Sequence, residues 1–263
     1  MKNSEPDIEL VFSRRGAEIL INNRSGTNIL HTGLLLSFRE MLHRLKAIGK
    51  IRTVVIASGN EGGFAAGADM EELRELNCAR SIAFSHLGQS IFIIMSKMPA
   101  LFIAAIDGYC IGGGFDLALA CDIIVMSQRS FFQHPGTARG FITGFGGNLR
   151  LSRATSFRMS TQALMLGRNI DATESKKIGL GIVQPAPETD QKATGEGRTN
   201  DGALTYAREI ASRFSSLDTG QIELLKRTTR TSRALSYQDR IGIEARLSLL
   251  SSIREKASLT PEE

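Results

Sequence analysis

The sequence predicts an α/β fold in which short buried strands alternate with helices. Between about residues 50 and 185, apolar runs of strand length alternate with glycine-rich loops and segments of helical spacing. The chain has 263 residues, of which 42% are hydrophobic and 22% charged; this suffices for one large domain with a sizeable core. From residue 203 onward only helical spacing remains. We therefore expect an α/β core over 1–198 and a helical C-terminal part over 199–263.

The N-terminal segments predict a hairpin, a helix and a strand. Residues 8–22, IELVFSRRGAEILIN, place two apolar runs around an Arg-Arg-Gly turn, the pattern of a β-hairpin. Residues 34–49, LLLSFREMLHRLKAIG, repeat apolar side chains at spacings of three and four and end at a glycine, as an amphipathic helix does. Residues 52–58, RTVVIAS, are typical of a short buried strand.

Two glycine-rich segments follow. Residues 59–76, GNEGGFAAGADMEELREL, predict a loop that runs into a helix with acidic residues in its first turn. Residues 100–110, ALFIAAIDGYC, predict a buried strand, and 122–127, DIIVMS, predict another. Between them Gly112–Gly114 open a short helix, although each glycine lowers helix stability by about 1 kcal/mol. Something must therefore approach this backbone closely.

The C-terminal third predicts a hinge between an α/β unit and helices. Residues 173–188, TESKKIGLGIVQPAPE, indicate a helix, a turn and a strand that ends in prolines. The polar stretch 185–202 is typical of a flexible hinge. The helical segments beyond it are 203–214, 220–230 and 237–256.

Composition excludes several classes of protein. No apolar run reaches the roughly 18–20 residues that span a bilayer, and the start MKNSEPDIEL lacks the apolar region of a signal peptide. Three cysteines and four scattered histidines lack metal-ligand spacing, so we expect no metal and buried thiols in the cytoplasm. The net charge of +5 is spread along a chain with no Trp and three Tyr, which argues against nucleic acid. The same surplus suits a phosphorylated small ligand.

The two glycine loops, FAAGADM at 64–70 and IGGGFD at 111–116, have two interpretations. Glycine allows a backbone N–H to approach a ligand, and a helix N-terminus adds partial positive charge. Two such loops aimed at one atom would form an oxyanion hole; alternatively, each is only a tightly packed turn. Neither has the spacing of a phosphate loop or a dinucleotide site, so NAD is not expected.

Four segments together resemble a known family. GGFAAGADMEEL, AAIDGYCIGGGFDLALACDIIVMS, GFITGFGGNLRL and ALMLGRNIDATESKKIGLGIVQP occur in this order. From about residue 8 to 187 the chain resembles the crotonase (enoyl-CoA hydratase/isomerase) superfamily. The resemblance implies a spiral of ββα units with a helical C-terminal part that drives assembly into a trimer or hexamer. It also implies an acyl-CoA thioester substrate, with coenzyme A as part of that substrate and no separate cofactor.

The resemblance also implies a site. The backbone N–H groups of Ala68 and Gly113 would hold the thioester oxygen, and Arg24, in the loop NNRSGTN, would contact CoA phosphate. The residues expected to bind substrate are Arg24, Ala66, Ala68, Asp69, Met70, Gly112, Gly113, Gly136 and Arg139. The chain lacks the family's usual C-terminal sequence and its usual pattern in the N-terminal loop. The acyl pocket and a CoA-binding lysine from a neighbouring subunit are therefore in doubt.

The acid/base positions depart from the hydratase pattern. Hydratases carry one glutamate where this chain has Asp116, which is either the principal acid/base or a charge at the start of the helix. At the second glutamate position the chain has Gly136, within FFQHPGTARG. Dihydroxynaphthoyl-CoA synthases also have glycine there, and a bound bicarbonate replaces their carboxylate. Hydration is therefore expected to be weak, and Gly136→Glu to raise it if the pocket has room.

His134 and Arg139 each have two alternative roles, and Asp122 has a structural one. His134 is either a substitute base, since histidine titrates near neutral pH, or a structural residue. Arg139 either binds an anion, such as a substrate carboxylate, or faces solvent. Asp122 is expected to cap the turn before the following strand.

We therefore expect an enoyl-CoA hydratase/isomerase-type enzyme with Ala68, Gly113, Asp116 and His134 as candidate catalytic residues. A single carboxylate can remove and return a proton, so isomerisation needs fewer groups than hydration does. The alternatives are an acyl-CoA decarboxylase or C–C lyase, and a non-catalytic acyl-CoA or RNA binder of the same fold.

Overall fold

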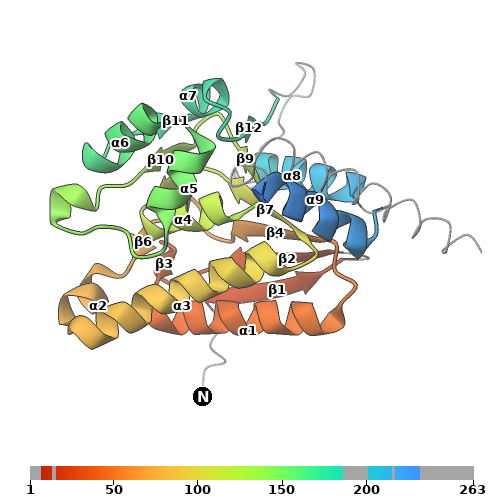
Figure 1. Ribbon diagram of the computed structural model, residues 1–263, viewed down its shortest axis with the longest axis horizontal. Coiled ribbons are helices and arrows are strands. Elements are labelled where there is room, and N and C mark those ends of the chain that lie inside the picture. Colours follow the sequence, from red (N-terminus) through yellow and green to blue (C-terminus); the bar gives the residue numbers. More distant parts are fainter. Residues whose placement is uncertain (1–6, 14–15, 186–200, 215–216, 232–263) are drawn as a thin grey trace, which may run out of the picture.

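The computed structural model describes residues 7–13, 16–185, 201–214 and 217–231. Three β-sheets form its framework (Figure 1). The large sheet has the order β1 (Ile8–Phe12), β2 (Gly16–Ile21), β4 (Thr53–Ser58), β7 (Leu101–Ile106), β9 (Ile123–Met126), β12 (Ile182–Val183). The second has the order β11 (Ile170–Asp171), β10 (Phe131–Gln133), β8 (Tyr109–Ile111), β5 (Gly63–Ala65). The pair β3 (Ile29–Leu30) and β6 (Gly67–Ala68) is the third.

The chain moves between the sheets in a repeated ββα order. Strands β4, β7 and β9 of the large sheet are each followed by a strand of the second sheet, namely β5, β8 and β10, and then by helix. Strands β2, β4, β7, β9 and β12 pair in parallel, and β1 joins β2 in the antiparallel hairpin that the sequence predicts. The predicted spiral of ββα units is confirmed.

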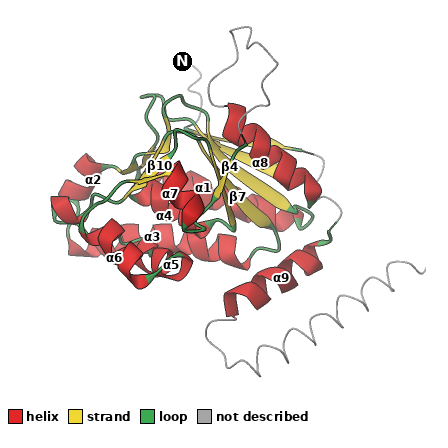
Figure 2. Cartoon of the chain, turned by 90° about the horizontal axis from the view of Figure 1, so that it is seen from above, coloured by secondary structure: helices red, strands yellow, loops and turns green. Residues whose placement is uncertain are grey.

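Helices cover both faces of the large sheet (Figure 2). Alternate residues of β4 divide between two cores: Val54 and Ile56 pack with α1 (Thr32–Ile48) and α3 (Cys78–Lys97), whereas Val55 and Ala57 pack with α8 (Asp201–Arg213). A parallel sheet buried on both faces explains the continuous apolar runs of its strands. Helix α8 therefore forms a layer on this sheet, and the predicted boundary at 198/199 falls outside the described residues.

The other helices lie around the second sheet (Figure 1), except α9, whose Lys226 contacts the backbone at the end of α3 and just before β7. Their bounds are α2 (Met70–Glu75), α4 (Gly113–Ala120), a 3-10 turn (Thr137–Arg139), α5 (Gly147–Ala154), α6 (Phe157–Met165), α7 (Ala172–Lys177) and α9 (Thr219–Thr231). None of the described helices is long and apolar enough to cross a membrane.

Most predicted elements are present, with two differences. The segment 100–110 contains two strands, because Gly108 turns the chain with a φ of 80° and a Cβ there would lie 2.0 Å from the Gly62 carbonyl oxygen. Helix α3 was not predicted: it exposes Ile82 and Ile93 as well as burying apolar residues, so its sequence lacks an amphipathic pattern. The predicted hinge falls largely, and the helix at 237–256 wholly, outside the described residues.

Asp122 attaches α9 to the core. Its Oδ2 accepts a hydrogen bond from the Phe102 backbone N–H at 2.9 Å and lies 2.9 Å from Lys226 Nζ. Its Oδ1 pairs with Arg230 at 2.7 Å. Lys226 is buried and also donates to the carbonyls of Met95 and Ala100. The expected local cap at Asp122 is therefore a bridge between β7 and α9.

Cysteine burial also differs from expectation, since Cys78 is exposed.

Candidate active site

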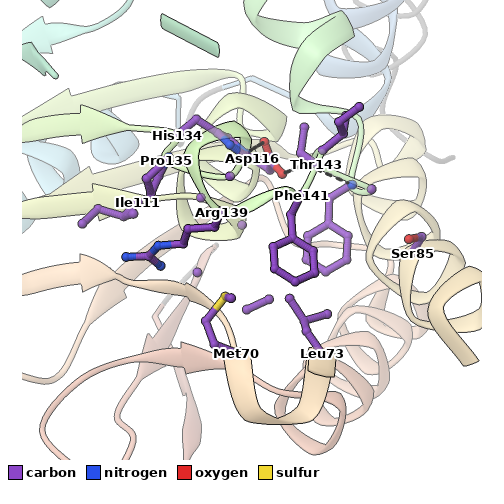
Figure 3. A pocket seen from close by; sticks show the side chains of 18 of the residues that line it. Met70, Leu73, Ser85, Ile111, Asp116, His134, Pro135, Arg139, Phe141 and Thr143 are labelled. Carbon is purple, nitrogen blue, oxygen red and sulfur yellow. Dashed lines mark hydrogen bonds and ion pairs between the residues drawn. The ribbon is translucent and has the colours of Figure 1, made fainter. Parts of the chain in front are cut away.

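One pocket of about 230 Å³ lies where the loops after β5, β8 and β10 meet (Figure 3). Its walls come from four stretches of the sequence, 66–73, 81–85, 111–116 and 134–145. The lining residues include Ala66, Gly67, Ala68, Met70 and Leu73; Ser81, Phe84 and Ser85; Ile111, Gly112, Gly113 and Asp116; His134, Pro135, Gly136 and Arg139; and Phe141 to Phe145.

The two glycine loops meet at this pocket. Gly67 and Gly112 have φ angles of 102° and 53°, which side chains other than that of glycine rarely adopt. A Cβ on Gly67 would lie 3.2 Å from Gly113 N, so the two backbones are in contact. A Cβ on Gly114 would lie 2.5 Å from the Ala65 carbonyl oxygen. The backbone conformation thus requires glycine at 112, and packing requires it at 114. Gly113 has an ordinary φ and lines the pocket.

Asp116 lies at the base of the pocket, and its side chain is fully buried. Its Oδ2 accepts a hydrogen bond from the Thr143 hydroxyl. Its Oδ1 lies 3.5 Å from His134 Nε2, and both of these atoms lack a hydrogen-bond partner among the described residues. No side chain caps α4 at Gly112. The carboxylate therefore faces Thr143 and His134 instead of capping its own helix.

Helix α5 holds this carboxylate from the opposite side. A Cβ on Gly147, the first residue of α5, would lie 1.7 Å from Asp116 Oδ1, so only glycine fits. Arg150, one turn further on, donates to the Phe145 carbonyl at 2.8 Å and lies over the Phe92 ring. Burial lowers the pKa of the Arg150 guanidinium, and the charge of Asp116 opposes that effect. A cation thus lies near the buried carboxylate.

The buried thiol of Cys110, in β8, takes no part in the acid/base chemistry. Burial raises the pKa of Cys110 well above its ordinary value, and the charges of Cys121 and Asp116 raise it further. The thiol therefore stays protonated at neutral pH.

The loop at Gly136 closes on itself. The Gly136 carbonyl accepts from the N–H groups of Arg139 at 2.9 Å and Phe141 at 2.8 Å. A Cβ on Gly136 would lie 2.8 Å from the Phe141 carbonyl oxygen, so a side chain requires the loop to shift. The condition that Gly136→Glu finds room is not met, and we no longer expect this substitution to raise hydration.

The structure brings together most of the residues that the sequence singled out. Nine of them line the pocket: Ala66, Ala68, Met70, Gly112, Gly113, Asp116, His134, Gly136 and Arg139. Arg139 is exposed at its edge. Asp69 and Arg24 are not among the lining residues; the Asp69 carboxylate accepts from the N–H groups of Glu71 and Glu72 and so caps α2.

Sequence reasoning missed Thr143, Phe145 and Gly147. Thr143 and Gly147 contact Asp116, and Phe145 packs against Gly113. The two residues of each contact are about thirty positions apart in the sequence. No local pattern links residues so far apart. The only signal was the glycine-rich composition of GFITGFGGNLRL, which indicates close packing without naming a partner.

The two sheets in ββα order and the glycine-lined pocket define a protein of the crotonase fold. A family model described as "Enoyl-CoA hydratase/isomerase" matches residues 14–194. The crystal structure of an enoyl-CoA hydratase from Bacillus anthracis superposes with a TM-score of 0.82 at 23% identity, covering 95% of this chain and 97% of that one. The chain therefore belongs to the enoyl-CoA hydratase/isomerase family, that is, the crotonase superfamily.

Curated relatives are similar at about the same level. A short-chain-enoyl-CoA hydratase of Clostridium acetobutylicum is 31% identical over 172 residues, which are 65% of this chain and 66% of that protein. The methylglutaconyl-CoA hydratase of mouse mitochondria is 32% identical over 250 residues, 92% of this chain and 78% of that protein. The match with the human mitochondrial enoyl-CoA hydratase domain-containing protein 2 spans 63% of the human protein.

Proposed function

We propose that this chain is an enzyme that acts on an acyl-CoA thioester through an enolate. In this proposal the backbone N–H groups of Ala68 and Gly113 hold the thioester oxygen, and Asp116 is the principal acid/base. Preorganised backbone donors aimed at a developing oxyanion typically contribute about 3–4 kcal/mol each.

One observation carries the proposal: the two glycine loops are in backbone contact beside a buried carboxylate in one pocket. The backbone conformation accounts for glycine at 112 and packing for glycine at 114, whereas a Cβ at 113 would meet only the side chains of Phe145 and Leu30, at 3.3 and 3.4 Å. Gly113 is thus the glycine of the triplet that lines the pocket although its backbone conformation does not require glycine. The names of the relatives, which are hydratases of enoyl-CoA and methylglutaconyl-CoA, support the same substrate class.

Isomerisation of a double bond is the simplest reaction for this site. Asp116 alone can remove a proton at Cα or Cγ and return it at the other carbon. Hydration needs a second group, because water must lose a proton while Cα gains one. The glutamate that serves this purpose in the family is Gly136 here, so a second group must be found elsewhere in the site.

A second candidate, decarboxylation or C–C cleavage, has one observation in its favour. Arg139 is a cation at the pocket edge and suits a carboxylate on the acyl group. In that reaction the oxyanion hole would supply most of the catalysis. A non-catalytic acyl-CoA or RNA binder remains the alternative outside enzymes.

Location, assembly and the CoA contact at Arg24 stay predictions. We infer a homo-oligomer, a trimer or hexamer, located in the cytoplasm, although several relatives are named as mitochondrial. Arg24 lies in the turn between β2 and β3 and is proposed to contact CoA phosphate from outside the described pocket.

Deuterium exchange at Cα of butyryl-CoA tests the proposal, because that exchange needs one base and an oxyanion hole but no second group. Wild-type protein in D₂O should exchange the Cα hydrogens, and Asp116→Asn should reduce the rate about 10²–10⁴-fold. Asp171→Asn is the matched control: Asp171 is exposed and caps α7, and asparagine caps equally well. Wild-type protein that gives no exchange above the uncatalysed rate would favour a non-catalytic binder, and exchange that survives in Asp116→Asn would overturn the assignment of the base to Asp116.

A further inference from the structure

We propose that His134 is the second proton-transfer residue of this site and works with Asp116 to replace the missing carboxylate. The inference rests on the proposed function and assigns the group that hydration would otherwise lack. It makes the protein a hydratase by a pair that faces one pocket from two elements, Asp116 from helix α4 and His134 from the loop after β10 (Figure 3).

The first observation is the contact between the two side chains. His134 Nε2 lies 3.5 Å from Asp116 Oδ1, with the side chains 9% and 0% exposed. Both atoms are buried and lack a hydrogen-bond partner among the described residues. Buried polar atoms are nearly always satisfied, and catalytic hydrogen bonds are often long before substrate binds. A shift of a few tenths of an ångström makes this contact a hydrogen bond.

The second observation is where the other ring nitrogen lies. A Cβ built on Gly136 would be 3.4 Å from His134 Nδ1. Nδ1 therefore lies beside the position from which the family glutamate would extend. The two ring nitrogens thus have different neighbours: Nε2 faces the Asp116 carboxylate, and Nδ1 lies beside the backbone position that carries a glutamate in the family.

The surroundings orient the pair. Thr143 donates to Asp116 Oδ2, which leaves Oδ1 for His134. Gly147 leaves room for the carboxylate, because Oδ1 occupies the space that a Cβ would take there. The other charged groups nearby are Arg150, whose charge reaches Asp116, and Arg139 at the pocket edge. A histidine with only a structural role would be expected to have its buried nitrogen paired.

The proton balance of hydration follows from this arrangement. His134 Nδ1 takes a proton from water, the water oxygen bonds to Cβ, and the Cα–Cβ π electrons move onto the thioester oxygen as an enolate. The Nε2 proton passes to Asp116 Oδ1, and Asp116 delivers it to Cα, where the enolate electrons form the C–H bond. After product leaves, a water in the pocket carries the Nδ1 proton back to Asp116 and so to Nε2. One water is added, and the protein is unchanged.

Two assays on His134→Gln separate this role from that of Asp116. Hydration of crotonyl-CoA needs both groups, whereas Cα exchange of butyryl-CoA needs Asp116 alone. We expect His134→Gln to lose hydration by about 10²–10⁴-fold and to lose a much smaller part of the Cα exchange rate. His43→Gln, on the exposed side of α1, is the matched control and should change neither. His134→Ala should regain hydration, and not merely stability, when free imidazole is added.

Each outcome decides the inference. Undiminished hydration in His134→Gln overturns it, as does loss of hydration and exchange in equal measure, which would make His134 only a packing partner of Asp116. Wild-type protein that exchanges the Cα hydrogens but does not hydrate crotonyl-CoA also overturns the inference, and it leaves the proposed function standing. Hydration that requires added bicarbonate equally in wild type and His134→Gln would assign the role to a bound anion. Exchange unaffected by Asp116→Asn would instead overturn the proposed function.

Discussion

At the scale of residues, the pocket depends on glycines whose reasons differ. Gly112 supplies a backbone conformation, Gly114 permits the approach of Ala65, and Gly147 leaves space for the Asp116 carboxylate. Gly136 keeps a tight loop closed under the Phe141 carbonyl. The sequence shows only that each of these positions is a glycine, and the structure is needed to distinguish the reasons.

Gly113→Val tests the oxyanion position. A Cβ at 113 would lie 3.3 Å from Phe145 and 3.4 Å from Leu30 side-chain atoms, so these side chains must give slightly and the branched valine also fills the pocket. We expect Cα exchange of butyryl-CoA to fall by about 10²–10³-fold, the usual cost of one oxyanion donor, with the fold retained in circular dichroism. Gly113→Ala should show a smaller loss. Wild-type exchange in Gly113→Val would rule out this position for the oxyanion.

Gly147→Ala tests whether α5 leaves the room that Asp116 needs for its proposed catalytic role. The added Cβ would meet Asp116 Oδ1 at 1.7 Å, so the carboxylate must leave its position between Thr143 and His134. Overpacking of this kind costs about 1–3 kcal/mol of folding stability, and exchange should fall at least about 10²-fold. Asn148→Ala, at the exposed next position of α5, is the control for both measurements. Full activity in Gly147→Ala would mean that the position of Asp116 is not critical.

At the scale of elements, α9 is joined to the core by a buried ionic group. Lys226 has one carboxylate and two carbonyls as partners and lies over the Phe102 ring. Burial lowers its pKa, and Asp122 opposes that effect. The lysine was recognised in the sequence only as part of a helical segment, because its partners come from the ends of α3 and β7 and from the start of β9.

Lys226→Ala should destabilise the protein strongly. Removing one member of a buried ion pair leaves Asp122 with Arg230 alone and leaves two carbonyls without this donor, at a cost of about 3 kcal/mol. Urea unfolding followed by circular dichroism measures the change. Arg230→Ala is the comparison, because Arg230 is 39% exposed and an exposed pair contributes about 1 kcal/mol or less. Equal losses of unfolding free energy in Lys226→Ala and Arg230→Ala would contradict this difference between a buried and an exposed ion pair.

At the scale of the whole molecule, α5 and α6 expose large apolar side chains. Leu149, Phe157, Met165 and Leu166 are each at least 66% exposed, and exposed apolar surface often marks an interface. This observation supports the predicted assembly, and the masses to expect are three or six times 28.6 kDa. Light scattering at micromolar concentration measures them. A stable monomer would contradict the prediction.

The amino-acid sequence by itself predicted the class of fold and the two glycine loops, and its family resemblance predicted a glycine at the second carboxylate position. These features depend on local periods and on motif spacing, which a linear pattern contains. Only the tertiary structure decided that Asp116 faces Thr143 and His134, that Gly136 has no room for a side chain and that Asp122 binds α9. Each of these contacts joins loops or helices whose separation in space is set by how the sheets and helices pack. That packing is a property of the whole chain, so no short segment encodes it.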